Sequence, residues 1–444
     1  MTRRPLGLVL LLMTGCAAER RIVEPSSSPL APMPKSPASV SEAPSEPFAD
    51  GLSLDKTLEL AAKNNPHLRS VRREMGLAGA ERITAGQWSA NPVLSSEIAR
   101  ATPLGRAGDS RLRVGLSQEF EIAGQRGRRI GVAEANLDRT RAAIADAERL
   151  LRAEATALFG ENLMLDERAD LTARNVGITE QMLAAAQARF DAQQIPETDL
   201  NLVRLQHQQA KNENARTISR RRAARLRLAA LLGEPSRAEF SLAGTLDAVP
   251  SDLSRDRTLA AAKETRPDLL ALETEIRMAR RQVDLERANV WPNPEVGAFY
   301  ERESAFLGPW ADRDHVVGLE FRLPLPIVNR REGEIAEARA RLRILESSRA
   351  DLDRQIERDV DLALERVKTA RETVRTYESE INRLSQSNLE AFQKAYQAGE
   401  VGTLEVLRAQ EDFNRVSEAY QDARLEYHTA RAELESAAGG RIPE

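Results

Sequence analysis

Residues Asp55–Leu68 read DKTLELAAKNNPHL, and a similar stretch, DRTLAAAKETRPDL, occupies Asp256–Leu269. The two stretches keep Asp, Thr, Leu, Ala, Pro and Leu at matching positions about 200 residues apart, which is the signature of a large internal repeat. Further landmarks recur in the same order: Asn91-Pro92 with Asn293-Pro294, Val114-Gly115-Leu116 with Val317-Gly318-Leu319, Ala133-Glu134-Ala135 with Ala336-Glu337-Ala338, and Phe190-Asp191-Ala192 with Tyr396-Gln397-Ala398. We interpret the chain as a tandem duplication, with repeats at residues 51–250 and 251–438 and a tail at 439–444.

Each repeat is predicted to contain a helix, two strands, a very long helix, a turn and a last helix. The first helix spans about 53–87 and is interrupted near Asn65-Pro66, because proline removes a helical hydrogen bond and restricts the residue before it. Its counterpart spans about 254–290 and ends at Trp291-Pro292.

Two candidate strands follow each Asn-Pro pair. Apolar and polar residues alternate over 111–122 and 314–323, which is typical of strands with one apolar face. The strands at 93–100 and 295–302 alternate less cleanly, and loops are expected at 102–110 and 304–313. The apolar positions of the clearer strands are Leu112, Val114, Leu116, Phe120 and Ile122 in the first repeat and Val317, Leu319, Phe321 and Leu323 in the second.

The long helices are predicted at 127–190 and 332–398, where the chain runs without a proline. At 1.5 Å per residue each would extend roughly 95 to 100 Å. A narrow apolar stripe with three-four spacing marks the second of them, with one skip near Val360. Its members are Leu342, Leu345, Leu352, Ile356, Val360, Ala363, Val367, Ala370, Val374, Tyr377, Ile381, Leu384 and Ala391, with Arg349 and Asn388 in the same series.

The first 15 residues are predicted to be a cleaved signal peptide, because two arginines precede a short apolar run and small residues. Met13-Thr14-Gly15-Cys16 resembles a bacterial lipobox, which predicts acylation of Cys16, the single cysteine of the chain. The alternative is an ordinary signal peptide that happens to contain a cysteine. Residues 16–50 are rich in Pro, Ser and Ala and are predicted to be a lipidated flexible tether.

The composition argues against an enzyme. Charged residues make up 30% of the chain and aromatic residues 4%, which is typical of long helices, and the formal net charge of −4 gives no basis for nucleic-acid binding. No phosphate loop or nucleophile elbow is present. The four histidines show no metal-ligand spacing, so we expect surface residues rather than ligands, and no metal, cofactor or catalytic site: His67, His207, His315 and His428.

Four strands per chain cannot close a barrel alone, and open sheet edges cannot face hydrocarbon. Two copies would make a minimal barrel and three would make a wider one with room for a lumen. The alternative is a small soluble sheet.

The landmarks in this order resemble the TolC-like outer membrane factor family, and most of all its CzcC-like heavy-metal efflux branch. They are the series Leu54 to Leu68, Asn91-Pro92, Val114 to Gly127, Leu323-Pro324-Leu325-Pro326, and Tyr396-Gln397-Ala398-Gly399-Glu400. The resemblance implies a mostly α fold with a small β part: a homotrimeric outer-membrane β-barrel, four strands per chain, continued by a long periplasmic α-helical barrel. The implied partners are a periplasmic adaptor, an inner-membrane pump of the resistance-nodulation-division class and outer-membrane lipid, and the implied function is passive exit of heavy-metal cations.

The resemblance also assigns site residues. The turns at 190–196 and 396–402 would be periplasmic tips on which the adaptor docks, with Phe190, Asp191, Tyr396, Gly399, Glu400 and Leu404 as candidates. The first tip departs from the pattern, with Gln193 in place of Gly399 and Pro196 in place of Gly402. A pore gate is implied at Glu405, with Arg408 where relatives carry a second acidic residue; the alternative for this pair is an exposed helical ion pair.

A second class of function stays open on the sequence alone, namely a lipid-anchored periplasmic coiled-coil scaffold or adaptor. Adaptors usually carry one helical hairpin between soluble β domains, whereas this chain is predicted to have two hairpins.

Overall fold

The computed structural model describes residues 51–100, 110–234, 240–246, 253–307 and 310–440, without the side chains of 304–313. All elements described below belong to the unit Phe48–Glu444. The predicted signal peptide, Cys16 and the tether lie outside the described residues.

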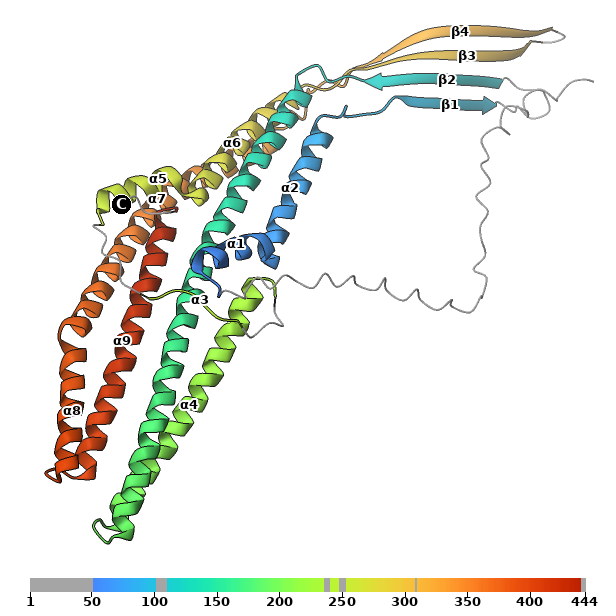
Figure 1. The fold of residues 1–444 in the computed structure, drawn as a ribbon. Helices are drawn as coiled ribbons and strands as arrows, with labels where there is room; N and C mark the ends of the chain where they lie inside the picture. Colours follow the sequence, from blue (N-terminus) through green and yellow to red (C-terminus); the bar gives the residue numbers. More distant parts are fainter. Residues whose placement is uncertain (1–50, 101–109, 235–239, 247–252, 308–309, 441–444) are drawn as a thin grey trace, which may run out of the picture. The chain divides into compact units, whose positions relative to one another are not determined.

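The same order of elements occurs twice along the chain (Figure 1). The first series is α1 (Leu54–Asn64), α2 (Pro66–Ala85), β1 (Val93–Arg100), β2 (Ser110–Glu119), α3 (Gln125–Asp191) and α4 (Glu197–Leu231). The second is α5 (Arg255–Thr265), α6 (Pro267–Ala288), β3 (Glu295–Leu307), β4 (Trp310–Arg322), α7 (Glu332–Thr376), the π-helical turn η1 (Tyr377–Ile381), α8 (Asn382–Ala398) and α9 (Thr403–Ala437).

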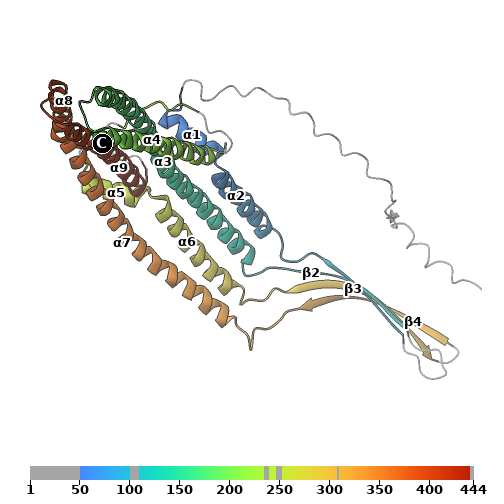
Figure 2. The same cartoon turned by 90° about the horizontal axis from the view of Figure 1, so that it is seen from below.

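The two series interlock. The strands form one antiparallel sheet in the order β1-β2-β3-β4, so the last strand of the first series pairs with the first strand of the second. The helices attached to these strands follow the same order, because α2 packs on α3, α3 on α6 and α6 on α7 (Figure 2). Within the described residues, no helix is both long and apolar enough to cross a membrane.

The core is distributed along the helices in several small clusters. One cluster joins α7 and α9 through residues such as Ile356, Val360 and Leu434, and another joins α1, α2, α3 and α4 around Leu68 and Leu228. Alanine fills many of the remaining buried positions. Small side chains let the helices approach closely while most of each helix surface stays polar.

The junction between α1 and α2 is held by Asn65. Its side-chain oxygen accepts from the backbone N–H of Leu68 at 2.9 Å, and its Nδ2 donates to the carbonyl of Leu231, the last residue of α4, at 2.9 Å. Pro66 takes the first position of α2, where the missing N–H does no harm. Beyond α4, Gly233 has φ +81°, and a Cβ there would lie 2.7 Å from the carbonyl oxygen of Asn64.

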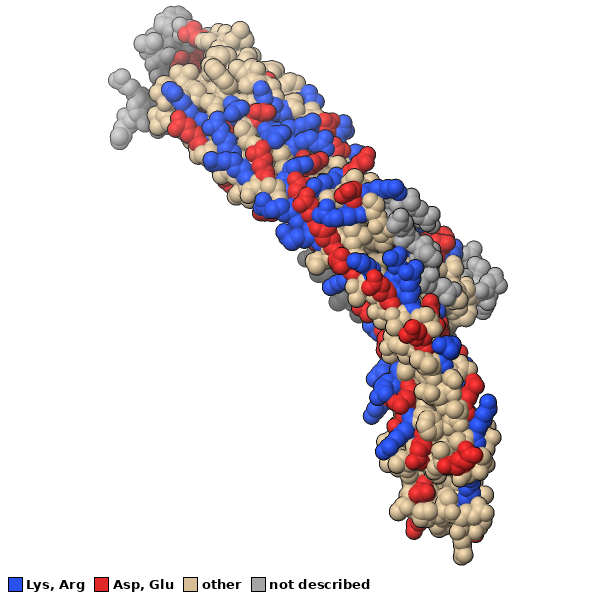
Figure 3. All heavy atoms as spheres, turned by 90° about the vertical axis from the view of Figure 1, so that its left-hand side faces the viewer, with Lys and Arg blue, Asp and Glu red and all other residues tan. Residues whose placement is uncertain are grey.

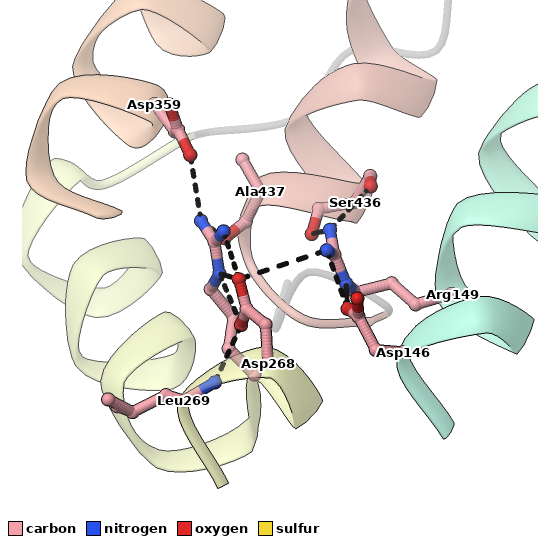
Figure 4. Close-up of polar contacts among 8 residues, drawn as sticks. Asp146, Arg149, Asp268, Leu269, Asp359, Ser436 and Ala437 are labelled. Atoms are coloured by element: carbon pink, nitrogen blue, oxygen red, sulfur yellow. Dashed lines mark hydrogen bonds and ion pairs between the residues drawn. The ribbon is translucent and has the colours of Figure 1, made fainter. Parts of the chain in front are cut away.

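The matching junction between α5 and α6 is held by the buried cation Arg266 (Figure 4). Its guanidinium donates to Asp268 at 2.6 Å, to Asp359 of α7 at 3.1 Å and to the carbonyl of Ala437, the last residue of α9, at 3.5 Å. Asp268 also accepts from the N–H of Leu269 at 2.9 Å.

Arg149 of α3 enters the same cluster from another side. It lies 4.0 Å from Asp268, pairs with Asp146 and donates to the carbonyl of Ser436 at 2.8 Å. Burial alone would raise the pKa of Asp268, but the hydrogen bond and charge of Arg266 outweigh it and lower that pKa. The cluster therefore joins α3, α6, α7 and α9 around one carboxylate that stays ionised.

Several predicted boundaries are corrected. The loop expected at 304–313 is wrong, because backbone pairing continues through Ser304↔Arg313 to Leu307↔Trp310 and leaves only 308–309 outside the described residues. Strand β2 ends at Glu119, before Phe120 and Ile122. The helix expected over 254–290 is divided at Arg266-Pro267, as the first one is at Asn65-Pro66.

The apolar stripe of the second long helix is confirmed only in its central part. Residues from Ile356 to Val374 are buried as predicted, but Leu384 is 53% exposed, Asn388 and Ala391 are exposed, and Leu389 is buried instead. The π-helical turn η1 explains the shift, because such a turn inserts one residue and rotates everything beyond it. The π-helical turn at 377–381 is a second irregularity, beyond the skip near Val360, where the four-residue spacing of Leu352, Ile356 and Val360 is packed against the core.

Candidate functional site

The sheet has one apolar face that is open to its surroundings. Residues that pair directly across antiparallel strands share a face. The register therefore places Leu116 of β2 beside Leu94, Ala298 and, one strand further, Leu319, which is 86% exposed. The other large apolar side chains of this face are Ile98, Leu112, Val114, Val296, Tyr300, Val317 and Phe321, and all are exposed.

The opposite face carries most of the charges, with Arg302, which pairs with Leu112, on the apolar side. Arg111 pairs with Glu301 and Glu303 at 3.0 Å each, which links β2 to β3. Glu320 of β4 accepts from Arg113 at 2.9 Å and from Arg322 at 2.8 Å. The two faces thus differ sharply in polarity, which suits a sheet that has lipid on one side and water on the other.

Phe299 is packed into the charged face. The Arg113 guanidinium lies 4.0 Å from the centre of its ring. A Cβ on Gly318, its partner on β4, would come within 2.5 Å of the same ring, so glycine makes this position possible.

The two outer strands are open. Among the described residues, β1 pairs only with β2, and β4 pairs only with β3. Each therefore presents a row of backbone N–H and C=O groups along its free edge.

The first hairpin tip joins α3 to α4 at 192–196. Gln193 has φ +59°, in the left-handed region, and the N–H of Gln194 donates to the carbonyl of Arg189 at 2.8 Å. In the second tip Gly399 has φ +78°, and Glu400 donates to Ala395 at 2.9 Å. Gln193 therefore adopts the left-handed conformation that Gly399 adopts in the second tip, and the two tips make the same backbone turn.

The structure brings parts of the two tips together. The guanidinium of Arg189 in α3 lies 4.4 Å from the centre of the Tyr396 ring in α8. Phe190 packs with Leu200 and Val203 of α4 against Leu407 of α9. Of the other predicted docking residues, Asp191 accepts from Gln187 at 2.9 Å, and Glu400 and Leu404 are exposed.

Glu405 and Arg408 lie in the first turns of α9, and both are exposed. In the described part of the chain no ion pair joins the two side chains, and the gate at Glu405 stays a prediction. The Glu405 carboxylate folds back toward the start of its helix, since a Cβ on Gly402 would lie 2.9 Å from it. A carboxylate is favoured there by the unpaired N–H groups of a helix N-terminus.

Two of the four histidines are not the surface residues that the sequence suggested. His207 is buried between α3 and α4 and shares a hydrogen bond of 3.2 Å with Thr179. His428 is largely enclosed, and burial with the nearby Arg431 lowers its pKa. Within the described residues, no group of histidine, cysteine and carboxylate side chains is arranged to hold a metal ion.

The helical surface carries charges of both signs. Figure 3 shows Lys and Arg interspersed with Asp and Glu over one face of the molecule. Many of these form exposed pairs between helices, such as Arg280–Glu346 at 2.9 Å and Arg366–Glu433 at 2.6 Å. A mixed surface of this kind favours contact with water rather than with a polyanion.

Comparisons with known proteins agree with this architecture. Residues 258–440 match the family model described as outer membrane efflux protein. The chain is 24% identical over 362 residues to the cobalt-zinc-cadmium resistance protein CzcC of Cupriavidus metallidurans, which covers 82% of this chain and 84% of the relative.

Two solved structures show the same fold. CusC superimposes with a TM-score of 0.71 at 16% identity, covering 89% of this chain and 93% of the other. The open-state outer membrane channel MtrE of Neisseria gonorrhoeae superimposes with a TM-score of 0.69 at 19% identity, covering 87% and 89%. On these grounds residues 258–440 match the outer membrane efflux protein family, whose members are passive channels rather than enzymes, and the chain has the fold of solved outer membrane channels.

Proposed function

We propose that this protein is the outer-membrane exit duct of a tripartite efflux system. The observation that supports it most is the sheet, with its exposed apolar face, its charged opposite face and its two open edges. A transmembrane sheet in lipid must satisfy all its backbone groups, so the edges require strands from other copies. Three copies of four strands make twelve, enough for a barrel with a lumen.

In this assembly the apolar face meets lipid and the ion pairs of Arg111, Arg113 and Arg322 line the lumen. The helices continue the duct into the periplasm as a helical barrel. The two repeats, 51–250 and 251–438, come from a tandem duplication, which accounts for the recurring order of elements. Cleavage after residue 15 and acylation of Cys16, followed by the tether at 16–50, anchor each copy to the outer membrane.

We place adaptor docking and the gate of the duct at the hairpin tips. Phe190, Asp191, Tyr396, Gly399, Glu400 and Leu404 form the surface on which a periplasmic adaptor docks, and an inner-membrane pump of the resistance-nodulation-division class delivers substrate. Exposed Glu405, with Arg408 beside it on α9, forms the gate where three copies converge. The free carboxylate of Glu405 is consistent with a ring that repels itself unless counter-charges approach.

We propose heavy-metal cations as substrate. The support is the relative CzcC, whose name states cobalt, zinc and cadmium resistance. The described residues hold no metal cluster that could select an ion, so selection belongs to the pump. Deleting the gene should lower the tolerated concentrations of cobalt, zinc and cadmium salts, and unchanged tolerance to all three would remove the substrate proposal.

The test of the duct itself is single-channel conductance in planar bilayers, with the oligomer mass measured on the same detergent-extracted sample. We expect a trimer and stable conductance steps, which grow more frequent in Glu405→Ala. A monomer that never conducts, in either variant, would overturn the duct and leave a periplasmic scaffold as the function.

A further inference from the structure

The segments that join helices to strands expose large apolar side chains. Trp88, between α2 and β1, is 56% exposed, and Trp291, between α6 and β3, is 63% exposed. After β4, the segment Leu323–Val328 leaves Leu325 and Ile327 exposed and Val328 97% exposed. Side chains of this kind gathered at one end of a sheet mark a contact surface.

These side chains extend the apolar face of the sheet. Phe120 follows β2 on the apolar side of the alternation, and its N–H donates to the carbonyl of Pro294 at 2.9 Å, which prolongs the β2–β3 ladder. The Trp88 ring meets Phe120 edge-on with 6.3 Å between centroids. Just after β4, Leu323 continues the apolar series of that strand beyond Phe321. The exposed tryptophan thus borders the face that we assign to lipid.

Three arginines stand at or just before the starts of α3 and α7, the helices that follow β2 and β4, and none has a carboxylate partner among the described residues. Arg126 lies 5.7 Å from the Trp88 ring and donates to the carbonyl of Gly86 at 2.7 Å. Arg128 and Arg330 are exposed. Over the described ranges none of the three forms an ion pair, whereas their neighbours Arg129 and Arg331 pair with Glu121 and Glu286.

Side-chain hydrogen bonds hold the segment between α6 and β3 in place. Gln125, which is buried at the start of α3, donates to the carbonyl of Trp291 and to Asn293 at 3.0 Å each. Asn293 in turn donates to Glu119 at 2.7 Å. The backbone that presents Trp291 is therefore fixed to β2 and α3.

We infer that this junction is a phospholipid-binding collar, made of Trp88, Trp291, Leu323–Val328 and the three arginines. The apolar side chains enter the acyl region of the leaflet at the helix end of the sheet, and the arginines bind the lipid phosphates. Tryptophan favours the boundary between hydrocarbon and headgroups, and the guanidinium fork matches a phosphate. The inference rests on the proposed function, because it takes the sheet to span the outer membrane.

A protein partner is the poorer occupant. The collar is continuous with the apolar face of the sheet, so a partner seated on it would have to displace the lipid beside that face. Unneutralised cations next to apolar side chains match the surface of a leaflet that contains anionic phospholipid.

Tryptophan fluorescence tests the depth of the collar. The chain has three tryptophans, Trp88, Trp291 and Trp310, so two double substitutions leave either Trp88 or Trp291 as the only fluorophore. Each full-length variant is reconstituted in vesicles of phosphatidylethanolamine and phosphatidylglycerol that carry bromine either near the headgroup end or near the methyl end of the chains. We expect stronger quenching by the shallow bromine for both tryptophans.

The conductance of the same vesicle samples separates this inference from the proposed function. A variant that conducts but shows no quenching, or stronger quenching by the deep bromine, would overturn the collar and leave the duct intact. If the single-tryptophan variants and the unsubstituted chain all fail to conduct and show no quenching, both the collar and the duct would be overturned.

Spin-labelled lipids test the arginines. The relative association of phosphatidylglycerol over phosphatidylcholine should fall by roughly fivefold per arginine at low salt in Arg126→Gln, Arg128→Gln and Arg330→Gln. The matched control is Arg69→Gln, Arg73→Gln and Arg257→Gln, which are exposed helical positions remote from the strands in sequence. Equal losses in both sets, or no loss in the collar set, would contradict phosphate binding at the collar.

Discussion

The junctions α1–α2 and α5–α6 occupy matched places but are stabilised by different chemistry. At the first, neutral Asn65 caps α2 and reaches the last carbonyl of α4. At the second, cationic Arg266 reaches the last carbonyl of α9 and is enclosed by Asp268 and Asp359. A glycine with positive φ follows each of those helix ends, at Gly233 and Gly439.

The two junctions share the same backbone geometry, but a neutral side chain stabilises the first and a charged cluster stabilises the second. In both halves the residue before the proline ties a helix start to the end of the following hairpin. In the second half the tie depends on charge and extends to α3 through Arg149. The two junctions should therefore respond differently to substitution and to pH.

Removal of Arg266 should have the largest effect. Arg266→Ala leaves two partly buried carboxylates without their cation, which should lower the free energy of unfolding by about 3 kcal/mol, the low end for breaking a buried pair. Asn65→Ala removes one cap and one hydrogen bond and should cost about 1 to 2 kcal/mol. Chemical denaturation of the purified protein measures both, with exposed Arg257→Ala as control. Equal losses for Asn65→Ala and Arg266→Ala would end the distinction between the two junctions.

The long helices sharpen the contrast between the halves, because α3 is α-helical throughout while α7 and α8 are separated by η1. Leu389→Ala empties a buried position and should destabilise by about 2 to 4 kcal/mol. Leu384→Ala, on the stripe that the sequence predicted, should stay within about 0.5 kcal/mol. If unfolding experiments gave the reverse order, the π-helical turn would be absent from the folded protein.

The terminal glycines should respond alike in the two halves. Gly233→Ala and Gly439→Ala each force a side chain into a left-handed conformation, and the added Cβ would lie 2.7 Å from Asn64 O and from Thr265 Oγ1 respectively. We expect a loss of about 1 to 3 kcal/mol for each. Gly440→Ala, where a Cβ meets nothing within 4 Å, is the matched control. A tolerated Gly439→Ala would show that the second junction does not need this close approach.

Acid should weaken the second junction more than the first. We expect this change in the free energy of unfolding to be the smallest of those predicted. The pKa of Asp268 is lowered in the folded chain, so its contribution is present above the ordinary carboxyl pKa of about 4 and is lost as the pH falls below it. Asn65 does not titrate. Comparing Asp268→Asn with the unsubstituted chain by denaturation between neutral and acidic pH should show a difference in stability that shrinks toward low pH. A constant difference would mean that the ionised carboxylate adds nothing.

Much of this architecture was predictable, because it depends on signals that are local in sequence. Pro66 marked the break between α1 and α2, alternation marked β2 and β4, and the absence of proline marked the long helices. The candidate tip residues were also placed correctly at the two turns. Their roles in docking and gating stay predictions.

The rest depends on contacts that no local pattern reveals. The extra residue of η1 leaves the composition of the helix unchanged, so the predicted stripe ran on to Leu384 while the folded helix buries Leu389. The Arg266 cluster joins residues far apart in the chain, and Arg266 alone resembles any charged helix residue. The strand residues 304–307 and 310–313 carry no clear alternation, so their pairing could not be predicted and depends on the partner strand.

The free edges of β1 and β4 also affect how the chain behaves in water before its strands pair with others. A sheet with both edges open and an apolar face bare is a template for aggregation in water. The edge strands carry Glu97 on β1 and Asp314, Glu320 and Arg322 on β4, the kind of charged residues that discourage mispairing. An isolated copy in water would expose both strand edges and the apolar face, so we expect it to need a chaperone until these surfaces are covered.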